Sequence, residues 1–263
     1  MGLSLILPTL NERENIERFV PELLSELPEL DEILVVDDSS TDGTGDAVLR
    51  AAQRDGRVRL IQRSGAPNLT DSIEMGIRAA RGDLVGWMDA DLVMRTPDLR
   101  TLIREVERGA DVAIGSRFAL GGRIKGQDRD GLAGRVLAMY NLRTTEDPWL
   151  GVFLSWTLNA VVLPALVGAG VRDYTSGILV ARRSVFDGIQ LHGHHGEYFI
   201  ELWAELLRRG CRVVEVPYPV QPRRYGRSKT GNDVVDYARR GRRYFTAGIA
   251  ARRLLRSYGN DTP

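Results

Sequence analysis

The stretch that most constrains the fold is an apolar run, Val85–Met88, which ends abruptly in Asp89-Ala90-Asp91. Such a run is typical of a buried parallel strand that delivers polar side chains to the carboxyl edge of a sheet, where open α/β folds bind ligands. Two carboxylates one residue apart suit a hard divalent cation, Mg²⁺ or Mn²⁺, which in turn holds substrate phosphates. An isolated Asp-x-Asp is more often a solvated acidic turn, so the neighbouring motifs decide.

Similar short apolar runs alternate with helical patterns along the chain. The helical patterns cover residues 16–27, where Pro21 should cause a kink or a break, then 69–80 and 197–209. This alternation predicts βαβ units, hence an α/β fold with a mostly parallel sheet flanked by helices. We expect the polar residues that follow the strands to share one edge of the sheet and form one site. The expected strands are 3–7, 33–36, 58–61, 83–88, 112–114, 178–181 and 213–216.

Composition sets broad limits. The 263 residues suffice for one large domain, and the single cysteine, Cys211, excludes a disulfide framework and fits a reducing compartment. The N-terminus shows no signal peptide, so export is not expected. The net charge of +1 conceals an asymmetry, because residues 223–263 carry 11 Lys and Arg against 3 Asp and Glu. A basic tail indicates an anionic partner, which could be a phosphate, a membrane lipid or a nucleic acid.

Six motifs occur in the order and approximate spacing of the family 2 glycosyltransferases, and the last two look like those of its dolichol-phosphate (polyprenol-phosphate) mannosyltransferase branch. The resemblance covers most of residues 3–230. The motifs are Pro8-Thr9-Leu10-Asn11-Glu12, the turn from Asp37-Asp38 to Thr44, Asp89-Ala90-Asp91, Gly115-Ser116-Arg117, Asp173-Tyr174-Thr175-Ser176-Gly177, and Arg223 to Lys229.

The resemblance implies a GT-A (Rossmann-like) fold that binds a nucleotide-diphosphate sugar, with GDP-mannose favoured and UDP-glucose plausible. Glu12 and Asp38 fit the role of acceptors for ribose hydroxyls and base N–H groups. Residues 11–12 also fit a helix N-cap with a first-turn acid, and both roles are compatible. The residues assigned to substrate binding are Pro8, Thr9, Asn11, Glu12, Asp37, Asp38, Ala90, Asp173, Ser176 and Gly177.

The implied reaction is inverting transfer of a hexose, with mannose favoured, to a polyprenyl or dolichyl phosphate. Asp89 and Asp91 would hold the Mg²⁺ or Mn²⁺ that bridges the departing diphosphate. The acceptor phosphate is ionised at neutral pH, so positioning and electrostatics can carry the rate without a strong base. The residues assigned to catalysis are Asp89, Asp91, Arg117, Arg223, Ser228 and Lys229.

Two positions depart from the branch's pattern. Val93 replaces a polar residue, often Gln, that follows the Asp-x-Asp pair, so metal affinity could be weak. Counting back from Ser155 and Asn159 places the family's usual basic residue at Gly151. An extra segment at about 126–150 offers Arg129, Arg135 or Arg143 as substitutes, and the sequence does not choose among them.

The segment 149–171 has no charged residue, which is compatible with an interfacial or acceptor-facing helix, with core packing, or with a membrane span. A membrane span is disfavoured because Arg117 and Asp173 must reach one site. The interfacial or acceptor-facing helix is favoured because a long polyprenyl acceptor would need such an apolar surface. From residue 232 the sequence predicts a basic amphipathic helix, with Val234, Tyr237, Ala238, Gly241, Phe245 and Gly248 on one arc. This helix could lie on an anionic membrane or dock on the catalytic domain.

The expected organisation is a catalytic domain at 1–230, containing the insertion and the apolar segment, and a basic tail at 231–263. We expect a cytoplasmic enzyme that associates peripherally with the membrane and does not bind nucleic acid. The alternatives are a soluble family 2 transferase that acts on a saccharide or small molecule, and a non-enzymatic basic binding module.

Overall fold

A computed structural model of the chain describes residues 2–91, 94–124, 127, 149–168, 170–221 and 234–260. Its first part alternates strands and helices: β1 Leu3–Thr9, α1 Arg13–Glu26, β2 Leu30–Asp37, α2 Thr44–Arg54, β3 Val58–Gln62, α3 Leu69–Ala79, β4 Leu84–Trp87, α4 Thr96–Glu107 and β5 Val112–Ser116. The later elements are α6 Trp149–Thr157, η1 Leu158–Val162, α7 Leu163–Val167, β6 Leu179–Arg182, η2 Arg183–Phe186, α8 Tyr198–Arg208, β7 Val213–Pro217 and α9 Val234–Asn260.

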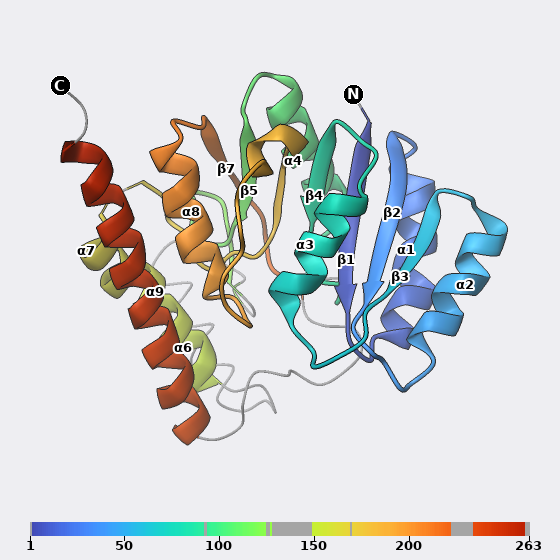
Figure 1. Cartoon of the computed structure of the whole chain (residues 1–263), viewed down its shortest axis with the longest axis horizontal. Helices are drawn as coiled ribbons and strands as arrows, with labels where there is room; N and C mark the ends of the chain where they lie inside the picture. The colour runs from blue at the N-terminus through green and yellow to red at the C-terminus, as the bar shows by residue number, and fades with distance from the viewer. Residues whose placement is uncertain are drawn as a thin grey trace.

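The described strands form one seven-stranded sheet in the order β3-β2-β1-β4-β6-β5-β7 (Figure 1). Strand β6 runs antiparallel to its neighbours β4 and β5, and the other strand pairs are parallel. Because β6 is reversed, the chain that leads into it lies at the edge where the parallel strands end. The mostly parallel α/β sheet predicted from the sequence is confirmed.

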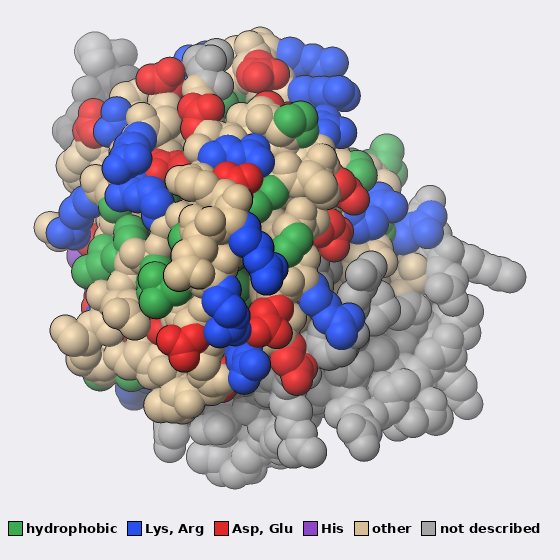
Figure 2. Space-filling view, turned by 90° about the vertical axis from the view of Figure 1, so that its right-hand side faces the viewer, with side chains coloured by type: hydrophobic (Ala, Val, Ile, Leu, Met, Phe, Trp, Pro, Cys, Tyr) green, Lys and Arg blue, Asp and Glu red, His purple; other side chains and the backbone are tan. Residues whose placement is uncertain are grey.

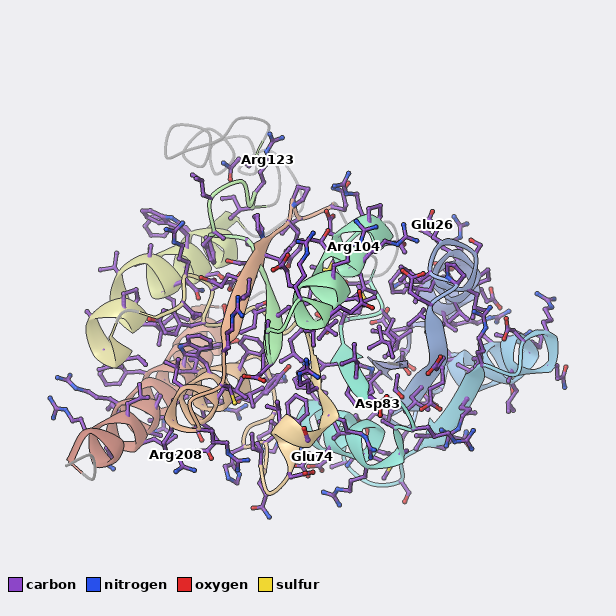
Figure 3. The ribbon with its side chains drawn as sticks, turned by 90° about the horizontal axis from the view of Figure 1, so that it is seen from above. Glu26, Glu74, Asp83, Arg104, Arg123 and Arg208 are labelled. Carbon is purple, nitrogen blue, oxygen red and sulfur yellow. The ribbon has the colours of Figure 1, made fainter. Side chains whose placement is uncertain are left out.

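The sheet is buried on both faces, which explains why its strands are near-continuous apolar runs. In β2, Ile33 and Val35 point into one core, together with residues of α1, α2 and α4. Leu34 and Val36 point into a second core with residues of α3, α8 and α9. Figure 3 shows these layers, with Glu26 and Arg104 on one side of the sheet and Glu74 and Arg208 on the other.

All seven expected strands form, each within a few residues of its predicted bounds. Helix α1 runs from Arg13 to Glu26 without interruption through Pro21, so of the two expected outcomes, a kink or a break, the break is wrong. Pro21 lies on the exposed side of the helix, where the backbone groups that its ring disrupts remain accessible to water.

The uncharged segment 149–171 is helical over most of its length. A π-helical turn, η1, joins α6 to α7 and places Asn159 and Leu163 in the interior. On the same segment Phe153, Leu154 and Val161 are exposed, so it both packs on the core and presents an apolar surface. None of the helices in the described part of the chain combines the length and the apolar character that a bilayer crossing requires.

The C-terminal helix α9 packs along α7 and α8 (Figure 1). Ala247 and Ala251 are buried, and Gly248 lies so close to Leu166 that an added Cβ would come within 2.5 Å of its Cδ2 atom. Docking is therefore the arrangement that this helix adopts. The predicted apolar arc is wrong for Phe245, whose exposed fraction is 48%, because the buried face runs through residues 247, 248 and 251 instead.

The face that contains α2 is a solvated one. Figure 2 shows Lys and Arg side chains interspersed with Asp and Glu over this face. Arg50 of α2 reaches Glu17 of α1 at 2.9 Å, and both side chains are largely exposed. Mixed charge without a continuous apolar patch is ordinary protein surface, so nothing on this face points to a ligand site.

Candidate active site

Polar residues from five segments meet at the carboxyl edge of the sheet. Thr9 ends β1 and pairs in register with Asp37, which ends β2. Asp89 follows β4, and Arg117 follows β5. The Asp173–Gly177 turn reaches the same edge because it precedes the reversed strand β6.

The loops after β1 and β2 are held together by direct hydrogen bonds. The side-chain oxygen of Asn11 accepts a hydrogen bond from the backbone N–H of Thr41 at 2.9 Å, and the N–H of Asn11 donates to the Ser40 hydroxyl at 2.8 Å. Asn11 and Ser39 both have positive φ angles, of 54° and 64°. This strained pair of loops forms a rigid wall beside Pro8 and the buried Thr9.

Glu12 stands at the N-terminus of α1, but its side chain does not cap the helix. Its carboxylate accepts a hydrogen bond from the Asn15 side chain at 2.7 Å. The capping acceptor is Asp42 of the neighbouring loop, whose Oδ2 accepts from the N–H of Arg13 at 3.0 Å. Burial alone would raise the pKa of Asp42, but hydrogen bonds from Thr44 and from backbone N–H groups outweigh it and lower the pKa. The sequence motif contained Asp42, but its spacing did not reveal this role.

Asp37 and Asp38 are both buried, and they have different surroundings. Oδ1 of Asp37 has no hydrogen-bond donor among the described residues. The Asp38 carboxylate already has partners. Its Oδ1 pairs with the Arg63 guanidinium, and its Oδ2 accepts a hydrogen bond from the backbone N–H of Asn68 at 2.6 Å. Arg63 directly follows β3, so its position at this edge was the signal that could have identified it from the sequence.

The Asp89-Ala90-Asp91 turn places its two carboxylates in different environments. Asp91 and Ala90 are buried, whereas Asp89 is exposed. The preceding strand is anchored by the indole N–H of Trp87, which donates to the hydroxyl of buried Tyr198 at 2.9 Å. The strand therefore ends in a fixed position, with one acid facing the interior and one facing solvent.

These two carboxylates fit a divalent cation by their chemistry. No cluster of three or more His, Cys, Asp or Glu residues suited to a metal occurs in the described part of the chain. Mg²⁺ is commonly held by one or two carboxylates together with substrate phosphates and water, and Asp89 and Asp91 match that donor set. Val93, the departure that bears on metal affinity, lies outside the described residues.

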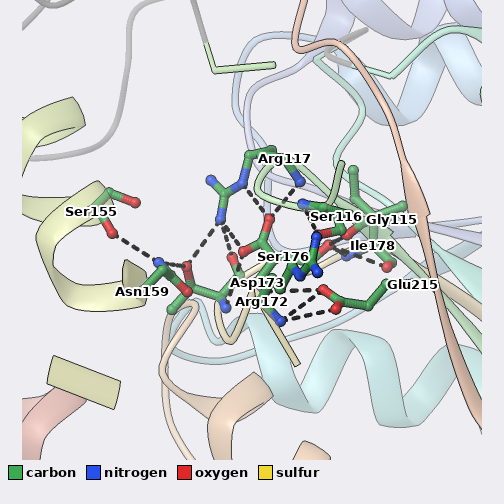
Figure 4. Close-up of polar contacts among 12 residues, drawn as sticks. Gly115, Ser116, Arg117, Ser155, Asn159, Arg172, Asp173, Ser176, Ile178 and Glu215 are labelled. Carbon is green, nitrogen blue, oxygen red and sulfur yellow. Dashed lines mark hydrogen bonds and ion pairs between the residues drawn. The ribbon is translucent and has the colours of Figure 1, made fainter. Parts of the chain in front are cut away.

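Arg117 forms a two-point ion pair with Asp173 (Figure 4). Its Nε donates to Asp173 Oδ2 at 2.8 Å and its Nη2 donates to Oδ1 at 2.7 Å, while its backbone N–H donates to Oδ2 at 2.9 Å. The Asp173 side chain is completely buried. Burial by itself would lower the pKa of Arg117, but the paired Asp173 carboxylate outweighs it and holds the pKa above its ordinary value.

The turn that carries Asp173 is fixed from two sides. Both oxygens of Glu215, on β7, accept the backbone N–H of Arg172, at 3.0 and 2.9 Å. The hydroxyl of Ser176 donates to the carbonyl of Gly115 and accepts from the N–H of Ile178, so Ser176 ties the turn to β5. Gly177 has a φ of +70°, a conformation that favours glycine. Ser176 and Gly177, predicted to bind substrate, shape this turn by these contacts.

Tyr218, immediately after β7, is a site residue that the sequence did not reveal. Its ring packs beside Gly115, and an added Cβ there would lie 3.2 Å from ring atom Cε1. Burial raises the pKa of its hydroxyl, Arg117 opposes that rise, and Asp173, Asp89 and Asp91 add to it. Tyr218 therefore lies in the electrostatic field of both the acid pair and the arginine pair.

Three predicted catalytic residues, Arg223, Ser228 and Lys229, lie outside the described residues. The same holds for the candidate substitutes in the insertion, Arg129, Arg135 and Arg143. The other predicted positions form two groups at the edge. Asp37, Asp38 and the loops beside them lie on the β1–β2 side, and Arg117 with Asp173 lies on the β5–β6 side. The Asp89–Asp91 turn follows β4, between the two groups.

Comparison with known proteins identifies relatives in sequence. A dolichol-phosphate mannosyltransferase of Pyrococcus furiosus is 30% identical over 91% of this chain, and the chain spans 62% of that protein's length. A polyprenol monophosphomannose synthase of Mycolicibacterium smegmatis is 33% identical over 85% of this chain and 79% of the relative. An undecaprenyl-phosphate mannosyltransferase of Micrococcus luteus is 30% identical over 90% and 91%, respectively.

Solved structures share the fold at lower sequence identity. Glucosyl-3-phosphoglycerate synthase of Mycobacterium tuberculosis, crystallised with Mn²⁺, UDP and phosphoglyceric acid, has a TM-score of 0.64 and 19% identity. The match covers 95% of this chain and 78% of that protein. A crystal of the same enzyme with Mg²⁺ and UDP gives a TM-score of 0.64 at 17% identity, over 95% of this chain and 79% of that one.

The family assignment rests on a match over most of the chain. Residues 4–189 match the model of the family described as Glycosyl transferase family 2. That range contains the strands and loops that bring Asp37, Asp91, Arg117 and Asp173 to one edge of the sheet. The chain belongs to glycosyl transferase family 2 and is a glycosyltransferase.

Proposed function

We propose that this glycosyltransferase moves a hexose, with mannose favoured, from a nucleotide-diphosphate sugar to a polyprenyl phosphate. The names of the three relatives support the acceptor and the sugar. The observation that carries the proposal is the pairing, at one sheet edge, of a carboxylate turn suited to a cation with a half-buried, pre-oriented arginine suited to a phosphate. GDP-mannose is the favoured donor.

The nucleoside would bind on the β1–β2 side of the edge. Asp37 offers a buried carboxylate oxygen with no described donor, which suits an N–H of a base or a ribose hydroxyl. Glu12 lies at the start of α1 beside the rigid loop pair. Asp38 acts indirectly in this arrangement, because its carboxylate holds Arg63 and Asn68 in place.

Asp89 and Asp91 would hold the diphosphate through Mg²⁺ or Mn²⁺, which supplies charge neutralisation for the leaving group when bound. An oxygen of the acceptor phosphate forms the new bond to the anomeric carbon, and the bond from that carbon to the nucleoside diphosphate breaks. The acceptor oxygen is already ionised, so no proton has to be removed. Attack opposite the leaving group inverts the anomeric centre. Arg117, held in position by Asp173, orients the acceptor by electrostatic attraction.

We also propose that the protein binds the membrane surface peripherally. Exposed apolar side chains, Phe153 and Leu154, lie on α6, and Phe245 lies on α9. Exposed basic side chains on α9, among them Arg242, Arg253 and Arg256, suit anionic lipid headgroups. A polyprenyl acceptor is anchored in the bilayer, so an enzyme that uses it needs such a surface.

The decisive experiment is a panel of nucleotide sugars against three acceptors: polyprenyl phosphate, a saccharide and a water-soluble phosphate ester. Released nucleoside diphosphate and the anomeric configuration of the product are measured. We expect turnover with GDP-mannose and polyprenyl phosphate, and an inverted product. Turnover confined to water-soluble acceptors would replace this proposal with that of a soluble transferase. Nucleotide binding without turnover on any acceptor would contradict the transferase reaction itself.

A further inference from the structure

The guanidinium of Arg117 has donors of two kinds. Nε and Nη2 are committed to Asp173, and Nη2 also approaches the carbonyl oxygen and the hydroxyl of Thr175, each at 3.0 Å. The third nitrogen, Nη1, has no hydrogen-bond partner among the described residues. Figure 4 shows this nitrogen on the side of the guanidinium that faces away from Asp173. The side chain is 23% exposed, so this nitrogen can meet a ligand.

The hydroxyl of Thr175 receives hydrogen bonds from two side chains. One is a shared hydrogen bond from Nη2 of Arg117, which can only donate and whose remaining hydrogen also faces the Thr175 carbonyl oxygen. The other comes from Nδ2 of Asn159 at 2.9 Å. The same Nδ2 lies 2.9 Å from the carbonyl oxygen of Ser155, which can only accept, so the orientation of this amide is fixed.

A hydroxyl that accepts two hydrogen bonds has used its lone pairs, and it still carries one hydrogen to donate. No described residue accepts that hydrogen. Thr175 is half-buried, so its hydroxyl is only partly accessible to solvent. Asn159 and Arg117 together therefore leave the Thr175 O–H available to donate to an acceptor on a ligand.

We propose that the Thr175 hydroxyl and Nη1 of Arg117 together bind one phosphate group of the substrate. The Thr175 oxygen lies 3.0 Å from Nη2, and Nη1 is attached to the same guanidinium carbon, so the two donors can reach two oxygens of one phosphate. This inference rests on the proposed function in naming the acceptor's phosphate as the ligand. The other source of the same chemistry is the donor's diphosphate.

Asn159 is the positioning residue of this arrangement. It enters from the π-helical turn η1, where Leu158–Val162 departs from regular α-helix, and it is itself buried. A local π-helical turn is often found at a functional site because it redirects side chains. Here it brings Nδ2 to the Thr175 oxygen and leaves the hydroxyl hydrogen facing outward.

The test compares Thr175→Val, which removes the hydroxyl and nearly keeps the side-chain shape, with Thr175→Ser, which keeps the hydroxyl. The apparent affinity for polyprenyl phosphate and for inorganic pyrophosphate, and the dissociation constant of the nucleoside diphosphate, are measured for each. We expect Thr175→Val to weaken binding of the acceptor and of pyrophosphate about 10- to 100-fold, as for a lost hydrogen bond to a charged group. Thr175→Ser should stay within about threefold of wild type.

The pattern of losses identifies the source of the phosphate. If Thr175→Val weakens acceptor binding and leaves nucleoside diphosphate affinity unchanged, the bound phosphate is the acceptor's. If it weakens only nucleoside diphosphate affinity, Thr175 and Arg117 bind the donor's diphosphate instead. Equal affinities for Val and Ser at position 175, for every ligand, would overturn the proposal. Thr157→Val is the matched control. Thr157 lies on the helical segment that carries Asn159, and its hydroxyl donates to the carbonyl of Phe153 at 2.9 Å.

A second variant separates ligand contact from loss of folding. Asn159→Asp replaces the donor with an acceptor, so the Thr175 hydrogen should turn inward to the new carboxylate. In that background Thr175→Val should weaken pyrophosphate and acceptor binding by less than about threefold. In wild type the same change should weaken binding by about 10-fold or more. Equal costs in both backgrounds would contradict the positioning role. The pyrophosphate titration needs no transfer reaction, so it tests Thr175 even if wild type fails to glycosylate polyprenyl phosphate.

Discussion

Asp89 and Asp91 are separated by one residue, yet they differ in exposure. Asp91 is 5% exposed, and Asp89 is exposed to solvent. A buried carboxylate at a ligand-binding edge is costly unless positive charge or hydrogen bonds compensate it, so the two acids should contribute unequally to cation binding. We expect Asp91, the buried one, to hold a cation more firmly because less water competes for it.

Asp91→Ala should therefore reduce turnover by at least about 100-fold, which corresponds to about 2.7 kcal/mol of lost transition-state stabilisation. It should also remove the Mn²⁺-dependent part of nucleotide binding, measured by calorimetric titration with and without the metal. Asp89→Ala should retain part of that binding. Undiminished turnover in the Asp91 variant would contradict the cation assignment.

The Arg117–Asp173 pair makes a separate prediction about stability. Asp173→Asn leaves the guanidinium without its counter-charge in a half-buried place, so the free energy of unfolding should fall by about 3–5 kcal/mol in denaturant titration. The control is Asp55→Asn, because Asp55 pairs with Arg57 at 2.7 Å where both side chains are partly exposed. That change should cost less than about 1 kcal/mol. If both variants lose a similar amount of unfolding free energy, burial of the Arg117–Asp173 pair does not increase its contribution to stability.

At the scale of residues, sequence motifs located the site but not its internal contacts. Asp37, Asp91, Arg117 and Asp173 were found because each belongs to a motif beside a strand. Asp38 pairs with Arg63, which lies 25 residues away in the sequence. Asn159 donates to Thr175, which lies 16 residues away. No local sequence pattern encodes such pairings. Glu215 was missed because a lone acid inside an apolar strand has no distinguishing spacing.

At the scale of elements, helix α9 carries two glycines with opposite surroundings. A Cβ at Gly248 would lie 2.5 Å from Leu166 Cδ2 and 3.2 Å from Leu163 Cδ2, whereas a Cβ at Gly241 would meet nothing within 4 Å. Gly241→Ala should raise the free energy of unfolding by about 0.5–1 kcal/mol through helix propensity. Gly248→Ala should instead lower it by about 1 kcal/mol or more, because the Leu166 side chain or the helix itself must shift within the packed contact. Thermal or denaturant unfolding that shifts equally for both would contradict the docked helix.

Helix α8 carries an acid whose protonation should affect stability. The Arg208 side chain, with Arg209, lowers the pKa of Glu205 to about 2 by hydrogen bonding, from an ordinary value of 4.5. Because the folded pKa is the lower one, this stabilisation is complete above about pH 5 and is lost as pH falls toward 2. The arginines are partly exposed, so its size should be about 1 kcal/mol. Glu205→Gln should flatten the pH dependence of unfolding in this window, and an unchanged slope would contradict the pairing.

The elements themselves were largely predictable, and the exceptions have physical causes. Strands buried on both faces give continuous apolar runs, which the sequence shows directly. The direction of β6 could not be read, since a buried strand has the same pattern in either direction. The uncharged segment 149–171 was ambiguous because its helix is only partly buried, and a partly buried apolar helix resembles a surface-binding one.

At the scale of the whole molecule, the reversed strand decides where the two halves of the site meet. It turns the Asp173 segment back to the edge reached by the parallel strands, so groups from residues 9 to 218 share one surface. Helices α6, α7 and α9 then lie together at the β7 side of the sheet (Figure 1). This placement puts exposed apolar and basic side chains on helices next to the part of the site that contains Arg117.

Membrane binding should therefore depend on charge and on apolar contact together. Liposomes that contain anionic lipid should bind the full chain, and binding should fall as salt shortens the Debye length below about 10 Å. Replacing the exposed Arg242, Arg253 and Arg256 with Gln should weaken binding by about 1 kcal/mol per residue. Nucleotide affinity should not change, because α9 packs on α7 and α8 at the β7 side of the sheet, whereas the nucleoside is proposed to bind on the β1–β2 side. The matched control is a triple Gln variant of Arg50, Arg54 and Arg78, exposed arginines on α2 and α3. Equal losses for both triple variants would show that total charge alone drives binding. If liposome binding depends neither on salt nor on the α9 arginines, the apolar side chains of α6 must provide the membrane contact.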